Sequence, residues 1–171
     1  MGKILYSSSV FDVEEYNVRF KKAHERYIRV REPSSAIILP VLSGERLILE
    51  RQYRHAIKKW IYELPGGHIN RGESPRKTAA RELKEETGYI ATSLKFMFKN
   101  YELPDLTTAS RYFYVAKGLR SGKRNLDPSE KIDIRMFALK RALEMVDSGT
   151  INDPATVSAL LYYSRNKKRL L

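Results

Sequence analysis

The stretch that decides the fold is residues 66–89, GGHINRGESPRKTAARELKEETGY, in which a glycine-rich run leads into a helical pattern. Ser74 is a favourable helix N-cap, and Pro75 suits the first helical position. Gly88 suits the position just beyond a helix, where a left-handed backbone is common. The pattern therefore predicts a helix that begins after Ser74 and ends before Gly88.

Three glutamates crowd the C-terminal end of this helix. Glu82, Glu85 and Glu86 stand at i, i+3 and i+4, so they are neighbours on one helix face. Each like-charged pair costs about 0.2–0.5 kcal/mol, and the negative end of the helix dipole costs each acid roughly 0.3–1 kcal/mol more. One interpretation is a solvated acidic helix end, partly balanced by Arg81 and Lys84. The other is a site for Mg²⁺ or Mn²⁺, because these hard cations bind carboxylate oxygens whereas zinc prefers softer ligands.

The glutamates belong to a longer spaced pattern, G-x5-E-x7-R-E-L-x-E-E-x-G-Y. Its fixed residues are Gly67, Glu73, Arg81, Glu82, Glu85, Glu86 and Gly88. The pattern resembles the Nudix box, whose usual form is G-x5-E-x7-R-E-U-x-E-E-x-G-U, with U a bulky apolar residue. Tyr89 stands in the last U position.

The resemblance implies an α/β (α+β) fold, a Nudix-type α/β/α sandwich with a mixed sheet. It also implies hydrolysis of a nucleoside diphosphate linked to another group. By position, Glu82, Glu85 and Glu86 would be the catalytic and metal-binding carboxylates, and the carbonyl of Gly66 would be a further metal ligand. A bound Mg²⁺ would neutralise phosphate oxygens and lower the pKa of a water, whose proton a carboxylate accepts.

Four other residues of the pattern have structural roles in this family. The resemblance implies that Glu73 and Arg81 brace the loop against the helix through an ion pair. Gly67 and Gly88 are the fixed glycines at the two ends of the box. We expect these residues to shape the site rather than to take part in the reaction.

The composition limits the possible classes of protein. The 171 residues are 42% hydrophobic and carry a formal net charge of +12, which predicts one globular domain with an anionic partner. The absence of cysteine excludes disulfides and thiolate zinc sites. Because neither a membrane span nor a secretory signal is evident, we expect a cytoplasmic protein. Basic residues are spread along the chain, so we expect the partner to be a small phosphorylated molecule rather than nucleic acid. We interpret the basic tail 164–171 as a solvated terminus.

The rest of the chain alternates strand and helix patterns. Strands are predicted within residues 16–33, 36–50, 92–103, 110–119 and 131–139, and helices over 140–149 and 153–168. Residues 60–73 begin as a strand and break into a loop. We assign residues 1–33 to an N-terminal antiparallel strand segment and residues 34–171 to the Nudix domain.

Two features resemble the ADP-ribose pyrophosphatase subgroup of the family. The motif RQYR at 51–54 precedes ELPGG at 63–67, and Pro104 lies sixteen residues after Gly88. In this subgroup we expect Arg54, or alternatively Arg51, to bind the diphosphate, because a planar guanidinium suits phosphate. Trp60 is a candidate for stacking on a nucleobase, and Pro104 marks the loop near the substrate. The resemblance also implies a homodimer in which the N-terminal strands reach across to the partner.

The chain departs from the subgroup at one position. Relatives usually carry a glutamate about five residues after the loop proline, and here position 109 is Ala109. The identity of the general base therefore stays open, and the candidates are Glu85, Asp105, Glu102 and Glu130. The main hypothesis is Mg²⁺-dependent hydrolysis of ADP-ribose, or of another nucleoside diphosphate sugar, to AMP and a sugar phosphate. The alternatives are another diphosphate (a dinucleotide, a dinucleoside polyphosphate, or a compound such as FAD or NADH), a nucleotide-binding module without catalysis, and RNA binding or cap removal.

Overall fold

The protein has a mixed α/β fold in a computed structural model that describes residues 2–21, 23–128 and 130–170. The strands are β1 (Lys3–Ser7), β2 (Asp12–Arg19), β3 (His24–Arg31), β4 (Ser35–Pro40), β5 (Arg46–Arg54), β6 (Lys59–Glu63), β7 (Gly66–His68), β8 (Tyr89–Tyr101), β9 (Ser110–Ser121) and β10 (Ile132–Ala138). The helices are α1 (Pro75–Thr87), α2 (Leu139–Asp147) and α3 (Pro154–Leu170), with a 3₁₀ turn at Ser43–Glu45.

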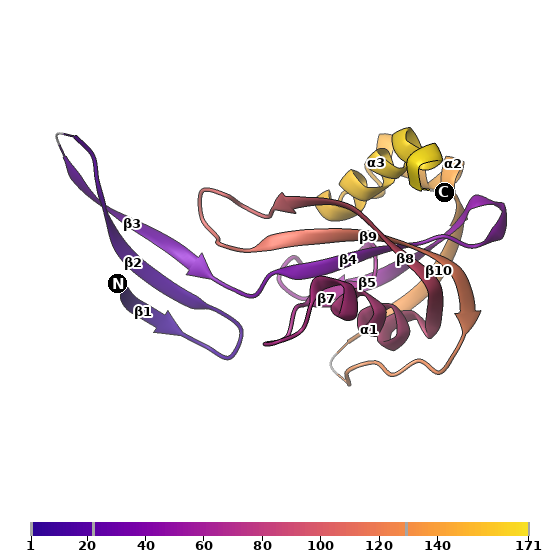
Figure 1. The fold of residues 1–171 in the computed structure, drawn as a ribbon, viewed down its shortest axis with the longest axis horizontal. Helices are drawn as coiled ribbons and strands as arrows, with labels where there is room; N and C mark the ends of the chain where they lie inside the picture. The colour runs from indigo at the N-terminus through magenta and orange to yellow at the C-terminus, as the bar shows by residue number, and fades with distance from the viewer. Residues whose placement is uncertain (1, 22, 129, 171) are drawn as a thin grey trace.

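Two sheets and three helices form the main body of the molecule. The larger sheet has the strand order β7-β4-β9-β8 and is mixed, because β4 and β9 run parallel. The smaller sheet, β10-β5-β6, is antiparallel. In Figure 1, α1 lies on one side of the mixed sheet, and α2 and α3 lie on the other. The predicted α/β/α sandwich with a mixed sheet is therefore confirmed.

Strand β4 separates two apolar cores because its side chains alternate between the faces of the sheet. Ala36 and Ile38 pack with Ala79 and Leu83 of α1 in the smaller core. Leu39 points the other way, into the larger core beneath α2 and α3. A strand covered on both faces is apolar throughout, which accounts for the unbroken run at residues 36–39.

Helix α1 has the ends that the sequence predicts. The Ser74 hydroxyl accepts a hydrogen bond from the Lys77 N–H at 3.4 Å, and Pro75 begins the helix. Gly88 adopts a left-handed φ of 75° and donates its N–H to the Lys84 carbonyl at 2.9 Å. A side chain at position 88 would strain this backbone, so the last glycine of the box has a conformational role.

The N-terminal strands β1, β2 and β3 form a separate antiparallel sheet that projects away from the main body (Figure 1). Strand β1 was not expected from the sequence. The β8–β9 loop joins this sheet to the main body, because the Val30 N–H donates to the Leu106 carbonyl at 2.8 Å and the Thr108 N–H donates to the Val30 carbonyl at 3.2 Å. The Thr107 hydroxyl adds a hydrogen bond of 2.7 Å to the Glu32 carboxylate.

The structure corrects part of the interpretation of the basic tail as a solvated terminus, because Arg165, Lys168 and Arg169 are exposed but the end of the tail packs against the sheet. Helix α3 continues to Leu170, whose side chain is buried, while Leu171 lies outside the described residues. The Lys117 and Lys95 ammonium groups donate to the carbonyls of Leu170 and Arg169 at 3.0 and 2.8 Å. Cations at a helix C-terminus are favourable there, and the packed leucine holds the tail against the sheet.

A second correction concerns the glycine-rich run, which was expected to be only a loop. Gly66–His68 forms β7 and pairs with β4 at the edge of the mixed sheet. Within the described residues, no helix combines the length and the apolarity needed to cross a membrane.

Candidate active site

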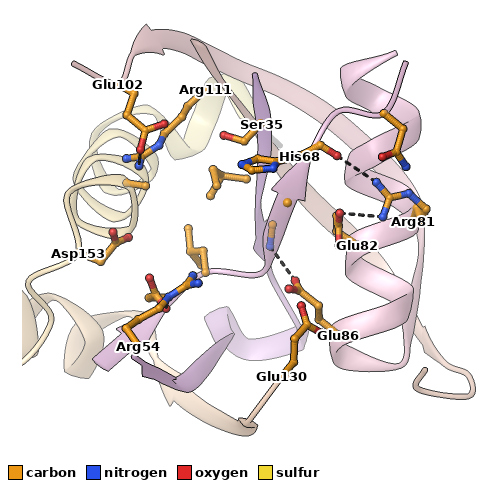
Figure 2. Close-up of a pocket in the computed structure, with 17 residues that line it drawn as sticks. Ser35, Arg54, His68, Arg81, Glu82, Glu86, Glu102, Arg111, Glu130 and Asp153 are labelled. Carbon is orange, nitrogen blue, oxygen red and sulfur yellow. Dashed lines mark hydrogen bonds and ion pairs between the residues drawn. The ribbon is translucent and has the colours of Figure 1, made fainter. Parts of the chain in front are cut away.

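A cavity of about 580 Å³ opens where α1, the two sheets and the start of α3 meet (Figure 2). One side is formed by Glu82 and Glu86 of α1 and by the backbone of β7. The opposite side holds Arg54 of β5 and Arg111 of β9. The cavity therefore brings carboxylates and guanidiniums to face one another from elements that are distant in the sequence.

Arg81 balances most of the acidic cluster at the helix end. Its Nη1 donates to Glu82 Oε1 at 2.8 Å and to Glu85 Oε2 at 3.0 Å. Its Nε and Nη2 donate to the two oxygens of Glu73 at 3.2 and 3.1 Å, and Nη2 also donates to the His68 carbonyl at 3.2 Å. The Glu73 carboxylate raises the pKa of the Arg81 guanidinium above its ordinary value. One guanidinium thus ties the loop to the helix and neutralises the repulsion among the acids.

The two glycines of β7 let the helix carboxylates approach the backbone closely. The Gly66 N–H donates to Glu86 Oε2 at 2.8 Å. A Cβ placed on Gly67 would lie 2.2 Å from Glu82 Oε1, well inside van der Waals contact. A side chain at position 67 would therefore displace the Glu82 carboxylate from its place against β7.

A buried pair of carboxyl groups lies at the acidic side of the cavity, where Glu86 lines the cavity and Glu50 does not. Glu50 is 1% exposed and Glu86 is 5% exposed. Burial raises the pKa of Glu86 strongly, and the neighbouring Glu50 and Glu82 carboxylates raise it further. Burial likewise raises the pKa of Glu50, and its Oε1 has no hydrogen-bond partner among the described residues. Ionising both groups is unfavourable unless a cation approaches them.

These residues fit a hard divalent cation. Carboxylate oxygens are the ligands that Mg²⁺ and Mn²⁺ prefer, and the excess of buried negative charge at Glu86 is what a dication would relieve. Within the described parts of the chain, no three acidic, histidine or cysteine side chains already stand in a metal-binding cluster. Arg81 engages Glu82 and Glu85 instead, so these two side chains would exchange a guanidinium for a metal ion.

The opposite side of the cavity carries two ion pairs. Arg54 Nε donates to Glu63 Oε2 at 2.8 Å, and the Arg111 guanidinium pairs with Glu102. The remaining N–H groups of both arginines supply donors for an anion in a cavity that both residues line. This side has the character of a phosphate-binding surface.

Asp153 anchors the start of α3 beside this surface. Its Oδ2 accepts from the Thr156 N–H and hydroxyl, each at 2.7 Å. The same hydroxyl accepts from the Leu64 N–H at 2.9 Å. The helix cap is therefore connected to the end of β6, and Asp153 lines the cavity near Arg54 (Figure 2).

Of the residues predicted to bind substrate, only Arg54 lines the cavity. Arg51 lies an odd number of positions away on β5, so it faces the other side of the sheet. Its guanidinium stacks 4.9 Å from the centroid of the Trp60 ring. Pro104 is exposed in the β8–β9 loop and does not line the cavity. Arg51, Trp60 and Pro104 therefore lie outside this cavity in the single chain.

The candidates for the general base are also separated by the structure. Glu130 lines the cavity and lies beside Glu86 in Figure 2. Glu102 is held by Arg111, Glu85 is held by Arg81, and Asp105 is exposed away from the cavity. Glu130 is the candidate that combines a place in the cavity with a position next to the acidic helix end.

Sequence reasoning missed Glu50, Glu63, Arg111 and Asp153. A signal for Glu50 was present in the sequence: β5 carries polar residues at the alternate positions 50, 52 and 54, directly after the apolar run 47–49. Alternate positions face the same way, so Glu50, Gln52 and Arg54 share one face of the sheet. Arg111 and Asp153 carry no comparable local signal, because only the packing of distant elements brings them to the cavity.

Residues 31–158 match the family described as NUDIX domain. This chain belongs to the Nudix hydrolase family. ADP-ribose pyrophosphatase of Bacillus subtilis (strain 168) is 33% identical over 162 residues, which span 92% of this chain and 87% of that protein. Methanol dehydrogenase activator of Bacillus methanolicus is 35% identical over 136 residues, which span 78% of this chain and 73% of that protein.

A solved structure shows the same likeness in three dimensions. The crystal structure of an ADP compounds hydrolase superposes with a TM-score of 0.87 at 26% identity, over 98% of this chain and 92% of the other. These similarities confirm the predicted Nudix fold and the assignment to an enzyme family whose relatives include ADP-ribose pyrophosphatase.

The raised pKa values of the buried pair predict how stability depends on pH without metal. The folded protein keeps these carboxyls protonated where the unfolded chain ionises them. The free energy of unfolding should therefore fall as pH rises from the ordinary carboxyl range towards about 8 for Glu50 and about 10 for Glu86. The loss is at most about 1.4 kcal/mol per pH unit for each carboxyl. Urea unfolding in EDTA between pH 6 and 9 measures it.

Glu86→Gln should flatten this pH dependence, since the amide has no proton to lose. Glu25→Gln removes an exposed glutamate and is the matched control, with the wild-type slope expected. A slope that is the same in Glu86→Gln and wild type would contradict the assignment of this titration to the buried pair.

Proposed function

We propose that this protein hydrolyses the diphosphate bond of ADP-ribose or of a closely related nucleoside diphosphate sugar, in a Mg²⁺-dependent reaction that yields AMP and a sugar phosphate. The observation that carries the proposal is the meeting of Glu82 and Glu86 with the β7 backbone, across a cavity from Arg54 and Arg111. The similarity to a Bacillus subtilis ADP-ribose pyrophosphatase along 92% of the chain supports the choice of substrate.

In the proposed site, Glu82, Glu85, Glu86 and the Gly66 carbonyl hold the metal ion. When bound, Mg²⁺ or Mn²⁺ supplies charge neutralisation of the phosphate oxygens and a water of lowered pKa. The Gly66 N–H keeps the Glu86 carboxylate oriented towards β7. Arg81 contacts both Glu82 and Glu85, so metal binding requires these two side chains to release the guanidinium.

Arg54 and Arg111 bind the diphosphate from the opposite side. Each guanidinium is oriented by a carboxylate, Glu63 or Glu102, and still presents N–H groups for phosphate oxygens. Oriented donors stabilise the charge of the substrate without having to rearrange during the reaction. The arginines thus place the phosphates between themselves and the acidic face of α1.

Glu130 serves as the general base in this proposal. It replaces the acid that relatives place in the β8–β9 loop, where this chain has the buried Ala109. Glu130 lines the cavity next to Glu86, so its carboxylate is placed to accept a proton from a water near the metal-binding side. The leaving group is a phosphate, so no nucleophilic side chain is required.

Other ADP-linked diphosphates form the second candidate class of substrates. The structural likeness to an ADP compounds hydrolase favours this wider class over dinucleoside polyphosphates. Both candidates use the same metal-binding and arginine faces, and they differ only in the group beyond the second phosphate.

A substrate screen tests the proposed function. The purified protein is incubated with ADP-ribose, GDP-mannose, NADH and diadenosine tetraphosphate, with Mg²⁺, with Mn²⁺ or with EDTA. A metal-independent phosphatase then releases phosphate from the monophosphate products. We expect the highest kcat/KM for ADP-ribose and complete loss of activity in EDTA. If no compound is hydrolysed with Mg²⁺ or Mn²⁺, the nucleotide-binding alternative replaces this one.

Two variants separate the metal-binding role from the base. Glu130→Gln should lower kcat by about 10²–10⁴-fold with little change in KM, which is the usual effect of removing a general base. Glu86→Gln should instead raise the Mg²⁺ concentration needed for activity, because a ligand is lost. Asp105→Asn changes an exposed acid outside the cavity and should leave the kinetics unchanged. A large loss in Asp105→Asn with normal Glu130→Gln would transfer the role of base to the β8–β9 loop.

We also propose that the protein is a homodimer held by its N-terminal sheet. A three-stranded sheet is stable when one of its faces is packed, yet this sheet projects from the main body and exposes Ile4, Leu5, Tyr6, Phe20 and Ile28. Burial of these side chains against a second copy would supply the missing packing.

Light scattering after gel filtration tests the dimer. Wild type should have twice the mass of the chain, and Ile28→Glu should shift the equilibrium towards monomer because a charge enters the contact. Ile90→Glu is the matched control, since Ile90 is 49% exposed and Ile28 is 52% exposed, but Ile90 lies on β8 of the main body. A monomeric wild type would refute the proposal.

A further inference from the structure

The C-terminal end of α1 is held by the connection between β9 and β10, residues 122–131. An α-helix leaves its last carbonyls without partners inside the helix. Here the Glu85 carbonyl accepts from the Asn125 N–H at 2.9 Å. The Gly88 carbonyl accepts from the Gly122 N–H at 2.6 Å. The Glu86 carbonyl, between them, accepts from Nε of Arg124.

Arg124 is the one side chain in this set, and it reaches in two directions. Its Nε bonds to the helix end, while its Nη2 donates to the Ile132 carbonyl at 3.0 Å. Ile132 begins β10 and pairs directly with Gln52 of β5. The guanidinium therefore links the turn that carries Glu86 to the sheet that carries Arg54.

The same connection contains Glu130, which lines the cavity. Glu130 is two residues before Ile132, and it lies beside Glu86 in Figure 2. Arg124 therefore bonds to the backbone at Glu86 and to the backbone two residues after Glu130.

We propose that Arg124 is a positioning residue of the active site, whose two-directional hydrogen bonding holds the metal-binding turn of α1 against β10 and thereby sets the affinity for the divalent cation. This proposal rests on the proposed function, because it takes Glu85 and Glu86 as metal ligands. Arg124 itself does not line the cavity, so it acts through the residues it holds.

Arginine suits this position better than lysine would. Its planar guanidinium offers N–H groups that point in several fixed directions, so one side chain can bond to two carbonyls on different elements. A lysine keeps the charge, but its flexible ammonium does not maintain both bonds in one geometry. The charge has a second effect, since Arg124 lowers the pKa of the buried Glu50 against the rise that burial causes.

The test compares Arg124→Ala, Arg124→Lys and the wild-type protein. Mn²⁺ binding is followed by the loss of the free-ion electron paramagnetic resonance signal, which does not depend on turnover. The Mg²⁺ concentration for half-maximal hydrolysis of ADP-ribose and KM at saturating Mg²⁺ are measured in parallel. Lys123→Ala removes one exposed positive charge from the adjacent position and is the matched control.

We expect Arg124→Ala to weaken Mn²⁺ binding about tenfold, at the lower end of the effects of residues that orient metal ligands, roughly 10–100-fold. Arg124→Lys should lie between Arg124→Ala and wild type. KM at saturating Mg²⁺ should change less than the Mg²⁺ requirement, and Lys123→Ala should behave as wild type. If Arg124→Ala does not fold, the comparison of Arg124→Lys with wild type alone decides the role of Arg124, and we expect weaker Mn²⁺ binding in Arg124→Lys.

Three results would overturn the proposal. The first is wild-type Mn²⁺ binding in folded Arg124→Ala, which would leave the arginine a purely structural role. The second is full wild-type binding in Arg124→Lys, which would show that charge rather than two-directional bonding matters. The third is an equal loss in Lys123→Ala. If wild type binds Mn²⁺ but hydrolyses no diphosphate, the proposed function fails, while the Mn²⁺ comparison still decides the role of Arg124.

Discussion

The constraint on which this structure depends is the placement of several carboxylates at the end of one helix, partly out of contact with water. Without compensating charges, these carboxylates would repel one another and would interact unfavourably with the negative end of the helix dipole. Arg81 balances Glu73, Glu82 and Glu85, and the Gly66 N–H together with a raised pKa accommodates Glu86. The arrangement of β7, the glycines before the helix and the loop after β9 all serve to hold these groups in one place.

Strand β5 shows how one element can serve both the core and the site. Leu47 and Leu49 enter the large core, while the other face presents Glu50 and Arg54 to the acidic side of the molecule. The alternation of side chains along a strand makes this division possible without any irregularity. The apolar half anchors the strand rigidly, and the polar half gains a fixed geometry from that anchoring.

Much of the fold was predictable from local chemistry. The limits of α1 follow from Ser74, Pro75 and Gly88, and the box pattern indicated the acidic helix face. Contacts between residues that are distant in the sequence were harder to predict. Arg111 and Arg124 look like ordinary basic residues in the sequence, and their roles depend on which strand lies beside which. Arg51 and Arg54 lie on opposite faces of β5 because they are three residues apart, but which face meets the cavity depends on the packing of the sheets and was left open for the same reason. The edge strand β7 was hidden by the turn-forming character of its glycines.

The hydrogen bonds between the β8–β9 loop and β3 have a further consequence for the motion of the N-terminal sheet. Leu106, Thr107 and Thr108 are all engaged with residues 30–32, so the loop cannot swing as a free flap unless this short splice breaks. Any movement of the loop is therefore coupled to a tilt of the whole N-terminal sheet. Because Glu102 and Arg111, which flank this loop, line the cavity, a displacement of the N-terminal sheet would be transmitted to that wall of the cavity.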